Sequence, residues 1–180
     1  LATTERKYIY GMVEAWEKSP NNEWIRLKAT NNDFFKSKTY NISSGRLFND
    51  VEHKNLSKVC VIGYLYAEEI MKDSEPLNKT VSIGSNRYTV IGVLGKDELN
   101  KKNGFNFNPW ERKQDLRSVY IPLKTGSAYL RKSSAIDYIY LQAENEDKFK
   151  SLKTQVTQLL LARRNMSHDF GFEDIGTFFL

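Results

Sequence analysis

Few residues of this chain have the chemistry for metal binding or nucleophilic attack. Its histidines, His53 and His168, lie far apart in the sequence, and no HxxxH or CxxC spacing accompanies them. Its single cysteine, Cys60, lies in the apolar run VCVIG, which predicts a buried structural thiol rather than a reactive one. A lone cysteine is compatible with the cytosol or with the cell envelope. The sequence therefore predicts no metal site and leaves the redox compartment open.

The acidic residues and serines do not form a recognisable catalytic set either. Glu68 and Glu69, like Glu173 and Asp174, are neighbours in sequence, and neighbouring side chains on a helix or strand point apart. The serines lie in neither a GxSxG nor an SxxK motif. Gly63 follows an apolar run, but without further glycines or a Lys-Ser/Thr pair it does not predict a phosphate-binding loop. We therefore predict no catalytic residue and no cofactor.

A binding surface is the remaining possibility, and the polar, aperiodic segment 96–117 is where we expect it. This segment carries Phe105, Phe107, Trp110 and Arg112. Two arrangements are open for the aromatic rings: they fold back to cover a sheet, or they form an exposed patch that contacts a partner. Under the second arrangement, Phe105, Phe107, Trp110 and Arg112 are the candidate partner-binding residues.

The overall composition is that of a globular protein with no specialised charge pattern. The chain has 180 residues, of which 40% are hydrophobic and 27% charged, and a formal net charge of +5. Lysine and arginine are scattered rather than clustered, so we predict no nucleic-acid partner. No stretch has the roughly 18 apolar residues that span a bilayer, and the first ten residues lack the apolar core of a signal peptide.

The elements that must position the segment 96–117 alternate between strands and helices. The helix prediction over 146–165 is strong, because apolar residues recur at helical spacing between an acidic start and a basic end. Residues 31–50 are expected to form a loop with a turn at 43–45, and a helix is expected after Gly63. Strand patterns cover 8–16, 24–30, 58–63, a hairpin over 79–94, 118–123, 136–144 and 168–176.

The order of several short motifs resembles a known family. GRLF (45–48) is followed by VCVIGYLYAEEI, then PLNKTVSIGSNRYTVIGVL, then VYIPL, and the chain closes with a helix ending LLLARRN and with DF. This series is similar to the periplasmic core domain of MacB-type ABC transporter permeases, which also precedes FtsX-like permease segments. The likeness runs from about residue 25 to 176. Asn78 stands where that family has a glycine, and asparagine tolerates the left-handed backbone conformation that such a turn needs.

The resemblance implies an α+β fold made of two small mixed α/β subdomains. Residues 1–30 together with 134–180 would form a Porter-like lobe with a β–α–β unit, and 31–133 an inserted Sabre-like lobe. The family usually opens with a further strand and helix, so the first lobe is expected to be incomplete here.

The resemblance also implies a function and partners. The chain would be a non-catalytic domain on the periplasmic or extracellular face of the cell membrane, held by flanking transmembrane helices. It would form a homodimer within the permease, engage an adaptor or substrate, and relay the motion driven by a separate ATP-binding domain during export. Two alternatives stay open: a lipoprotein-releasing domain of LolC/LolE type that binds a chaperone, and a soluble enzyme. The enzyme would require His168 and several carboxylates to meet in one deep pocket.

Overall fold

The structure is a computed structural model that describes residues 6–95, 108–167 and 169–173. Two compact units divide the chain: Tyr8–Leu141, and the two ends Leu1–Lys7 and Gln142–Leu180. The strands are β1 (Arg6–Lys18), β2 (Trp24–Thr30), β3 (Ile42–Gly45), β4 (Val59–Gly63), β5 (Thr80–Ile83), β6 (Asn86–Leu94), β7 (Val119–Pro122) and β8 (Tyr138–Ala143). The helices are α1 (Asp33–Ser37), α2 (Asp50–Lys54), α3 (Pro109–Leu116), α4 (Leu123–Gly126) and α5 (Glu146–Arg163), with two π-helical segments, η1 (Tyr66–Met71) and η3 (Ser127–Arg131).

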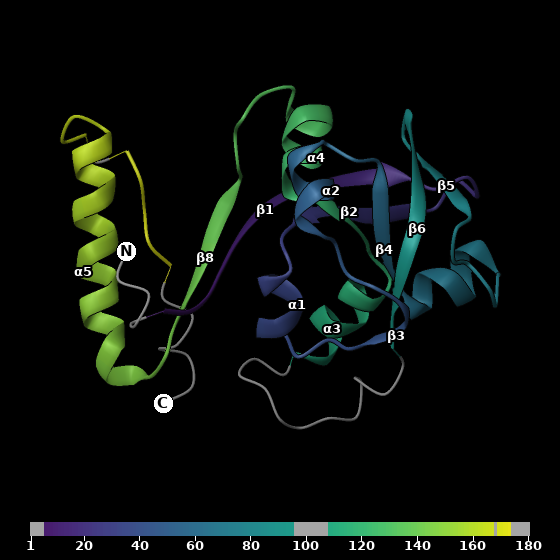
Figure 1. Ribbon diagram of the computed structural model, residues 1–180, viewed down its shortest axis with the longest axis horizontal. Coiled ribbons are helices and arrows are strands. Elements are labelled where there is room, and N and C mark those ends of the chain that lie inside the picture. Colours follow the sequence, from purple (N-terminus) through teal and green to yellow (C-terminus); the bar gives the residue numbers. More distant parts are fainter. Residues whose placement is uncertain (1–5, 96–107, 168, 174–180) are drawn as a thin grey trace. The chain divides into compact units, whose positions relative to one another are not determined.

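In the described part of the chain the strands form one mixed sheet in the order β3-β6-β4-β7-β2-β1-β8, with β5 paired to β6 (Figure 1). β1 and β2 are antiparallel, β2 and β7 are parallel, and β7 and β4 are antiparallel. The mixed α+β class predicted from the sequence is confirmed. The assignment of 1–30 with 134–180 and of 31–133 to two lobes stays a prediction.

Helices cover both faces of the sheet in the unit Tyr8–Leu141. On one face, Phe34 of α1 packs against Tyr120 of β7, and Leu116 ends α3 with its side chain fully buried. On the other face, α4 lies so close to β2 that a Cβ on Gly126 would stand 2.0 Å from the Cβ of Ala29. A buried core of aromatic and branched side chains fills the space between the sheet and these helices. Cys60 belongs to this core, where burial raises the pKa of its thiol, so the predicted structural thiol is confirmed.

Close backbone contacts and a left-handed turn explain why two glycines and one asparagine stand in the motif stretches. A Cβ on Gly63 would lie 1.9 Å from the backbone oxygen of Leu116, so only glycine lets the end of α3 approach β4. A Cβ on Gly92 would similarly lie 2.3 Å from the backbone oxygen of Arg46. Asn78 has φ +62°, which confirms the left-handed turn expected at the position where the family has a glycine.

Several predicted elements are confirmed, and three were wrong. The hairpins β1–β2 and β5–β6 and the helix α5 lie where the sequence patterns predicted. The loop expected over 31–50 instead contains α1, anchored by the buried Phe34 and Phe35, and β3, whose residues pair with β6 in place of the turn expected at 43–45.

The aperiodic segment expected over 96–117 contains a helix, α3, in its second half. Asn108 caps this helix through its side-chain oxygen, and Pro109 occupies the first turn, which is a favoured start for a helix. The strand expected over 168–176 is wrong for residues 169–173, which form no strand, so no second strand of a β–α–β unit follows α5 within them.

Candidate functional site

One face of the β1–β2 ladder carries a row of polar and aromatic residues. Directly opposed residues of an antiparallel pair share a face, and so do residues two apart on one strand. Three successive cross-strand pairs therefore lie on one face, running toward the hairpin turn: Glu14–Lys28, Trp16–Arg26 and Lys18–Trp24. The alternate residues Val13, Leu27 and Ala29 point into the core on the opposite face.

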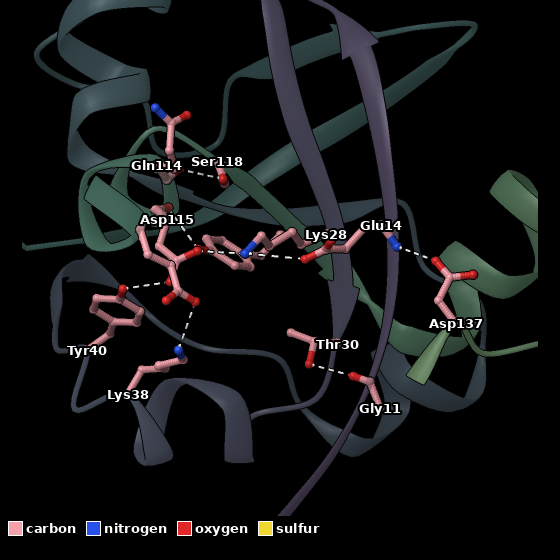
Figure 2. A network of polar contacts seen from close by, with 12 residues as sticks. Gly11, Glu14, Lys28, Thr30, Lys38, Tyr40, Gln114, Asp115, Ser118 and Asp137 are labelled. Carbon is pink, nitrogen blue, oxygen red and sulfur yellow. Dashed lines mark hydrogen bonds and ion pairs between the residues drawn. The ribbon is translucent and has the colours of Figure 1, made fainter. Parts of the chain in front are cut away.

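The innermost pair is buried beneath α1 and α3. The Lys28 ammonium lies 2.6 Å from a carboxylate oxygen of Asp115 and 3.5 Å from one of Glu14. The side chain of Lys28 is 4% exposed and that of Asp115 is 1% exposed. Figure 2 shows Lys28 extended between the two carboxylates, with Asp115 reaching down from α3. The two opposite charges compensate each other in a region that excludes water.

Two tyrosines complete the hydrogen bonding of Asp115. The Tyr40 hydroxyl donates to the second carboxylate oxygen at 2.8 Å, and the Tyr120 hydroxyl donates to the Asp115 backbone oxygen at 2.8 Å. Burial, and then the neighbouring Asp115 charge, raise the pKa of Tyr40 well above its usual value. The phenol therefore remains a proton donor at any physiological pH. This network ties α3 to β2, to β7 and to the segment before β3.

A cleft of about 200 Å³ opens beside this network. Its charged groups are mostly paired, since Lys38 contacts Glu111 at 3.2 Å and Lys28 contacts Glu14. Burial and a hydrogen bond with Glu14 raise the pKa of Tyr138 at its wall. The lining residues are Tyr10, Met12, Glu14, Arg26, Lys28, Phe34, Lys38, Glu111, Tyr138 and Tyr140.

In the outer two pairs, cations stack on indole rings; Trp16, Lys18 and Trp24 are exposed and Arg26 is half-buried. The Arg26 guanidinium carbon lies 5.2 Å from the ring centre of Trp16 and 5.9 Å from that of Trp110 on α3. The Lys18 ammonium lies 5.3 Å from the ring centre of Trp24. All three are cation–π distances. These five residues, Trp16, Lys18, Trp24, Arg26 and Trp110, are called the tryptophan surface below.

Of the four candidate partner-binding residues predicted from the sequence, the structure describes two, and these two differ in exposure. Trp110 is 61% exposed on the tryptophan surface, whereas Arg112 is buried, with its guanidinium 4.8 Å from the ring centre of Tyr40. Phe105 and Phe107 lie outside the described residues, so the partner-binding roles of these two, and of Trp110 and Arg112, stay predictions.

The histidines raised in the sequence analysis do not form a site in the described residues. His168 is outside the described residues. His53 packs its ring against Phe48 with a centroid distance of 5.5 Å, and burial lowers the pKa of its imidazole. Across 6–95, 108–167 and 169–173, no three His, Cys, Asp or Glu side chains converge to hold a metal ion.

Sequence reasoning missed the strand residues of the tryptophan surface. The signal for them was present, because a hairpin turning at 19–22 sets Lys18 opposite Trp24 and Trp16 opposite Arg26. The burial of Lys28 had no local signal, since its partner Asp115 lies 87 residues further along the chain.

Comparison with known proteins identifies the family. The sequence model of the MacB-like periplasmic core domain matches residues 5–159. The chain belongs to the MacB-like periplasmic core domain family. Among curated proteins, it is 23% identical over 149 residues to the "Macrolide export ATP-binding/permease protein MacB" of Azoarcus sp. (strain BH72), a match that covers 83% of this chain. It is 26% identical over 144 residues, or 80% of this chain, to the protein of the same name from Neisseria meningitidis (strain Z2491). The chain spans 21% of the length of each of these relatives.

Two solved structures share the fold. The periplasmic region of MacB from Actinobacillus actinomycetemcomitans superposes with a TM-score of 0.76 at 18% identity, covering 98% of this chain and 76% of that one. The extracellular domain of the noncanonic ABC-type transporter YknZ from Gram-positive bacteria superposes with a TM-score of 0.73 at 19% identity, covering 94% of this chain and 82% of that one. Within the part of this chain that the structure describes, no helix combines the length and apolarity needed to cross a membrane.

Proposed function

We propose that this chain is the non-catalytic, partner-engaging domain of a MacB-type ABC transporter permease, located on the outer side of the cytoplasmic membrane. There it binds an adaptor or the transported substrate, and it relays the motion driven by a separate ATP-binding domain. The family match over residues 5–159 carries this proposal. The curated relatives that support it are named as macrolide export ATP-binding/permease proteins and are far longer than this chain.

A buried ion pair that joins two elements of the surface supports a binding role. The buried Lys28–Asp115 pair joins β2 to α3, and these two elements carry Arg26 and Trp110. A docking surface on rigid elements loses little conformational entropy when a partner binds. A domain that relays motion needs the same property, because a force applied to one element must move its neighbours.

The test uses the full-length permease that contains this chain. We would replace the domain with a flexible Gly/Ser linker, and compare export and ATP hydrolysis with those of the intact protein. The proposal predicts that export is lost while basal ATP hydrolysis by the ATP-binding domain continues. Export that proceeds equally well without the domain would contradict the proposal. If transport by the permease depends on a lipoprotein-carrying chaperone and not on an adaptor, the result would instead support the LolC/LolE-type alternative.

A further inference from the structure

All tryptophans of the chain lie on the tryptophan surface, and all are more than half exposed. The chain has three, and Trp16, Trp24 and Trp110 are 55%, 57% and 61% exposed. Tryptophan is highly buried on average, so three such side chains gathered in water require an explanation. Exposed aromatic residues that cluster with arginine are typical of the energetically dominant residues of protein interfaces.

The cations of this surface lack acidic partners among the residues that the structure describes. Arg26 stacks on Trp16 and Trp110, and Lys18 donates a hydrogen bond to the Asn22 side chain at 2.7 Å, but neither forms an ion pair there. The next pair inward differs, because Lys28 contacts two carboxylates.

Three acidic residues on the elements around this surface are already engaged in ion pairs, and Glu17 lies on the opposite face of β1. Glu14 contacts Lys28, Glu111 contacts Lys38, and Glu23 pairs with Arg117. Within the described residues, therefore, no carboxylate pairs with the two outer cations, and both can bind a negatively charged group.

We propose that the tryptophan surface is a docking site for an acidic segment of a partner protein. A carboxylate of the partner pairs with Arg26, a second pairs with Lys18, and apolar side chains beside them pack on the indole rings. This inference rests on the proposed function, because it names the surface through which the domain engages its partner.

A protein partner fits this surface better than a small molecule does. The adjoining cleft is about 200 Å³ and its charged groups other than Arg26 are paired, whereas sites for small ligands are usually about 300–1,000 Å³ and mostly apolar. Stacking between two indoles holds the Arg26 guanidinium in place, so its planar donor fork is already oriented to bind a carboxylate.

Intrinsic fluorescence tests the proposal directly, because every tryptophan of the chain is on this surface. The probe is a short peptide of glutamate, leucine and alanine, compared with the same peptide carrying glutamine in place of glutamate. We expect the free protein to show red-shifted emission that acrylamide quenches strongly. We expect the glutamate peptide to change the emission, to protect it from acrylamide, and to bind more weakly as salt increases.

Variants at matched arginines complete the test. Arg26→Gln should weaken binding of the glutamate peptide about tenfold or more, since a charged hydrogen bond contributes about 1.5–3 kcal/mol. Arg87→Gln is the control, because Arg87 is exposed on β6, which β4 and β7 separate from β2 in the sheet. Trp110→Ala is a second test variant, because it removes one indole without altering the strands.

Several outcomes would overturn the inference: no binding of the glutamate peptide, equal affinity for the two peptides, or equal effects of Arg26→Gln and Arg87→Gln. If these occur while removal of the domain still stops export, the docking site is refuted and the proposed function stands. If removal of the domain leaves export intact, the proposed function itself fails.

Discussion

Replacing Asp115 with asparagine should destabilise the protein substantially, because the change leaves a buried ammonium without its main counter-charge. Asparagine has almost the same size as aspartate and keeps an oxygen that accepts from Tyr40. Lys28, which is 4% exposed, would then face a neutral amide at the position where a carboxylate oxygen lay 2.6 Å away. The effect of the substitution therefore isolates the charge.

The size of the loss follows from the surroundings of Lys28. Removing one partner of a buried ion pair costs about 3–5 kcal/mol. Glu14 remains 3.5 Å from the ammonium, so we expect about 3 kcal/mol, at the lower end of that range. For a chain of this size, this loss corresponds to a fall in Tm of roughly 6–12 °C.

The assay is urea unfolding followed by far-ultraviolet circular dichroism, since the exposed tryptophans are insensitive reporters of the core. A double-mutant cycle with Lys28→Met should give a coupling of about 2 kcal/mol, because removing both charges leaves neither unpaired. Lys38→Met is the control: the Lys38–Glu111 pair is more exposed and should contribute less than about 1 kcal/mol, with a stronger dependence on salt. A cost below about 1 kcal/mol for Asp115→Asn, or additive effects in the cycle, would refute this account of the network.

Three further predictions concern a close backbone contact, a left-handed turn and an ion pair. Gly63→Ala should cost about 3 kcal/mol or prevent folding, because the added Cβ would lie 1.9 Å from a backbone oxygen, whereas Gly171→Ala, with no atom within 4 Å, should leave the Tm unchanged. Asn78→Ala should cost about 1 kcal/mol in urea unfolding and Asn78→Gly should be neutral or slightly stabilising, since φ at this residue is +62°; equal losses for both variants would contradict this. Two hydrogen bonds from Arg46 lower the pKa of Glu52, so its stabilising effect is present above the unfolded pKa of about 4.3 and disappears as pH falls through the lower folded value. Glu52→Gln should therefore cost about 1–2 kcal/mol at pH 7 and progressively less as the pH falls through the lowered folded pKa, and a cost independent of pH would show that the charge is unimportant.

The elements with strong local patterns could be predicted from the sequence. The alternation in β1 and β2, the helical spacing in α5 and the left-handed turn at Asn78 depend on residues close together in the chain. The family resemblance depended on the order of such local motifs, and the match over residues 5–159 confirms it.

The parts that were missed depend on contacts between distant segments. α3 has a weakly amphipathic sequence and is held by Asp115, which contacts Lys28 and Tyr40, and by Leu116, which lies against Gly63 of β4. β3 is polar and becomes a strand by pairing with β6, about 50 residues away. The tryptophan surface likewise combines two strand residues, Trp16 and Arg26, with Trp110 from a helix. Only the three-dimensional fold brings these residues together.

Site-specific photocrosslinking in the full-length permease tests the central claim most directly. A photoreactive amino acid would replace Trp110 on the tryptophan surface in one variant and Arg87 on β6 in another, each in export-competent cells. The account predicts that the variant at Trp110 crosslinks to a protein whose deletion also stops export, through an acidic segment of that protein, and that the variant at Arg87 does not. Crosslinking of this protein at Arg87 but not at Trp110, or no crosslink at Trp110 while export proceeds, would contradict the claim that this surface engages the partner.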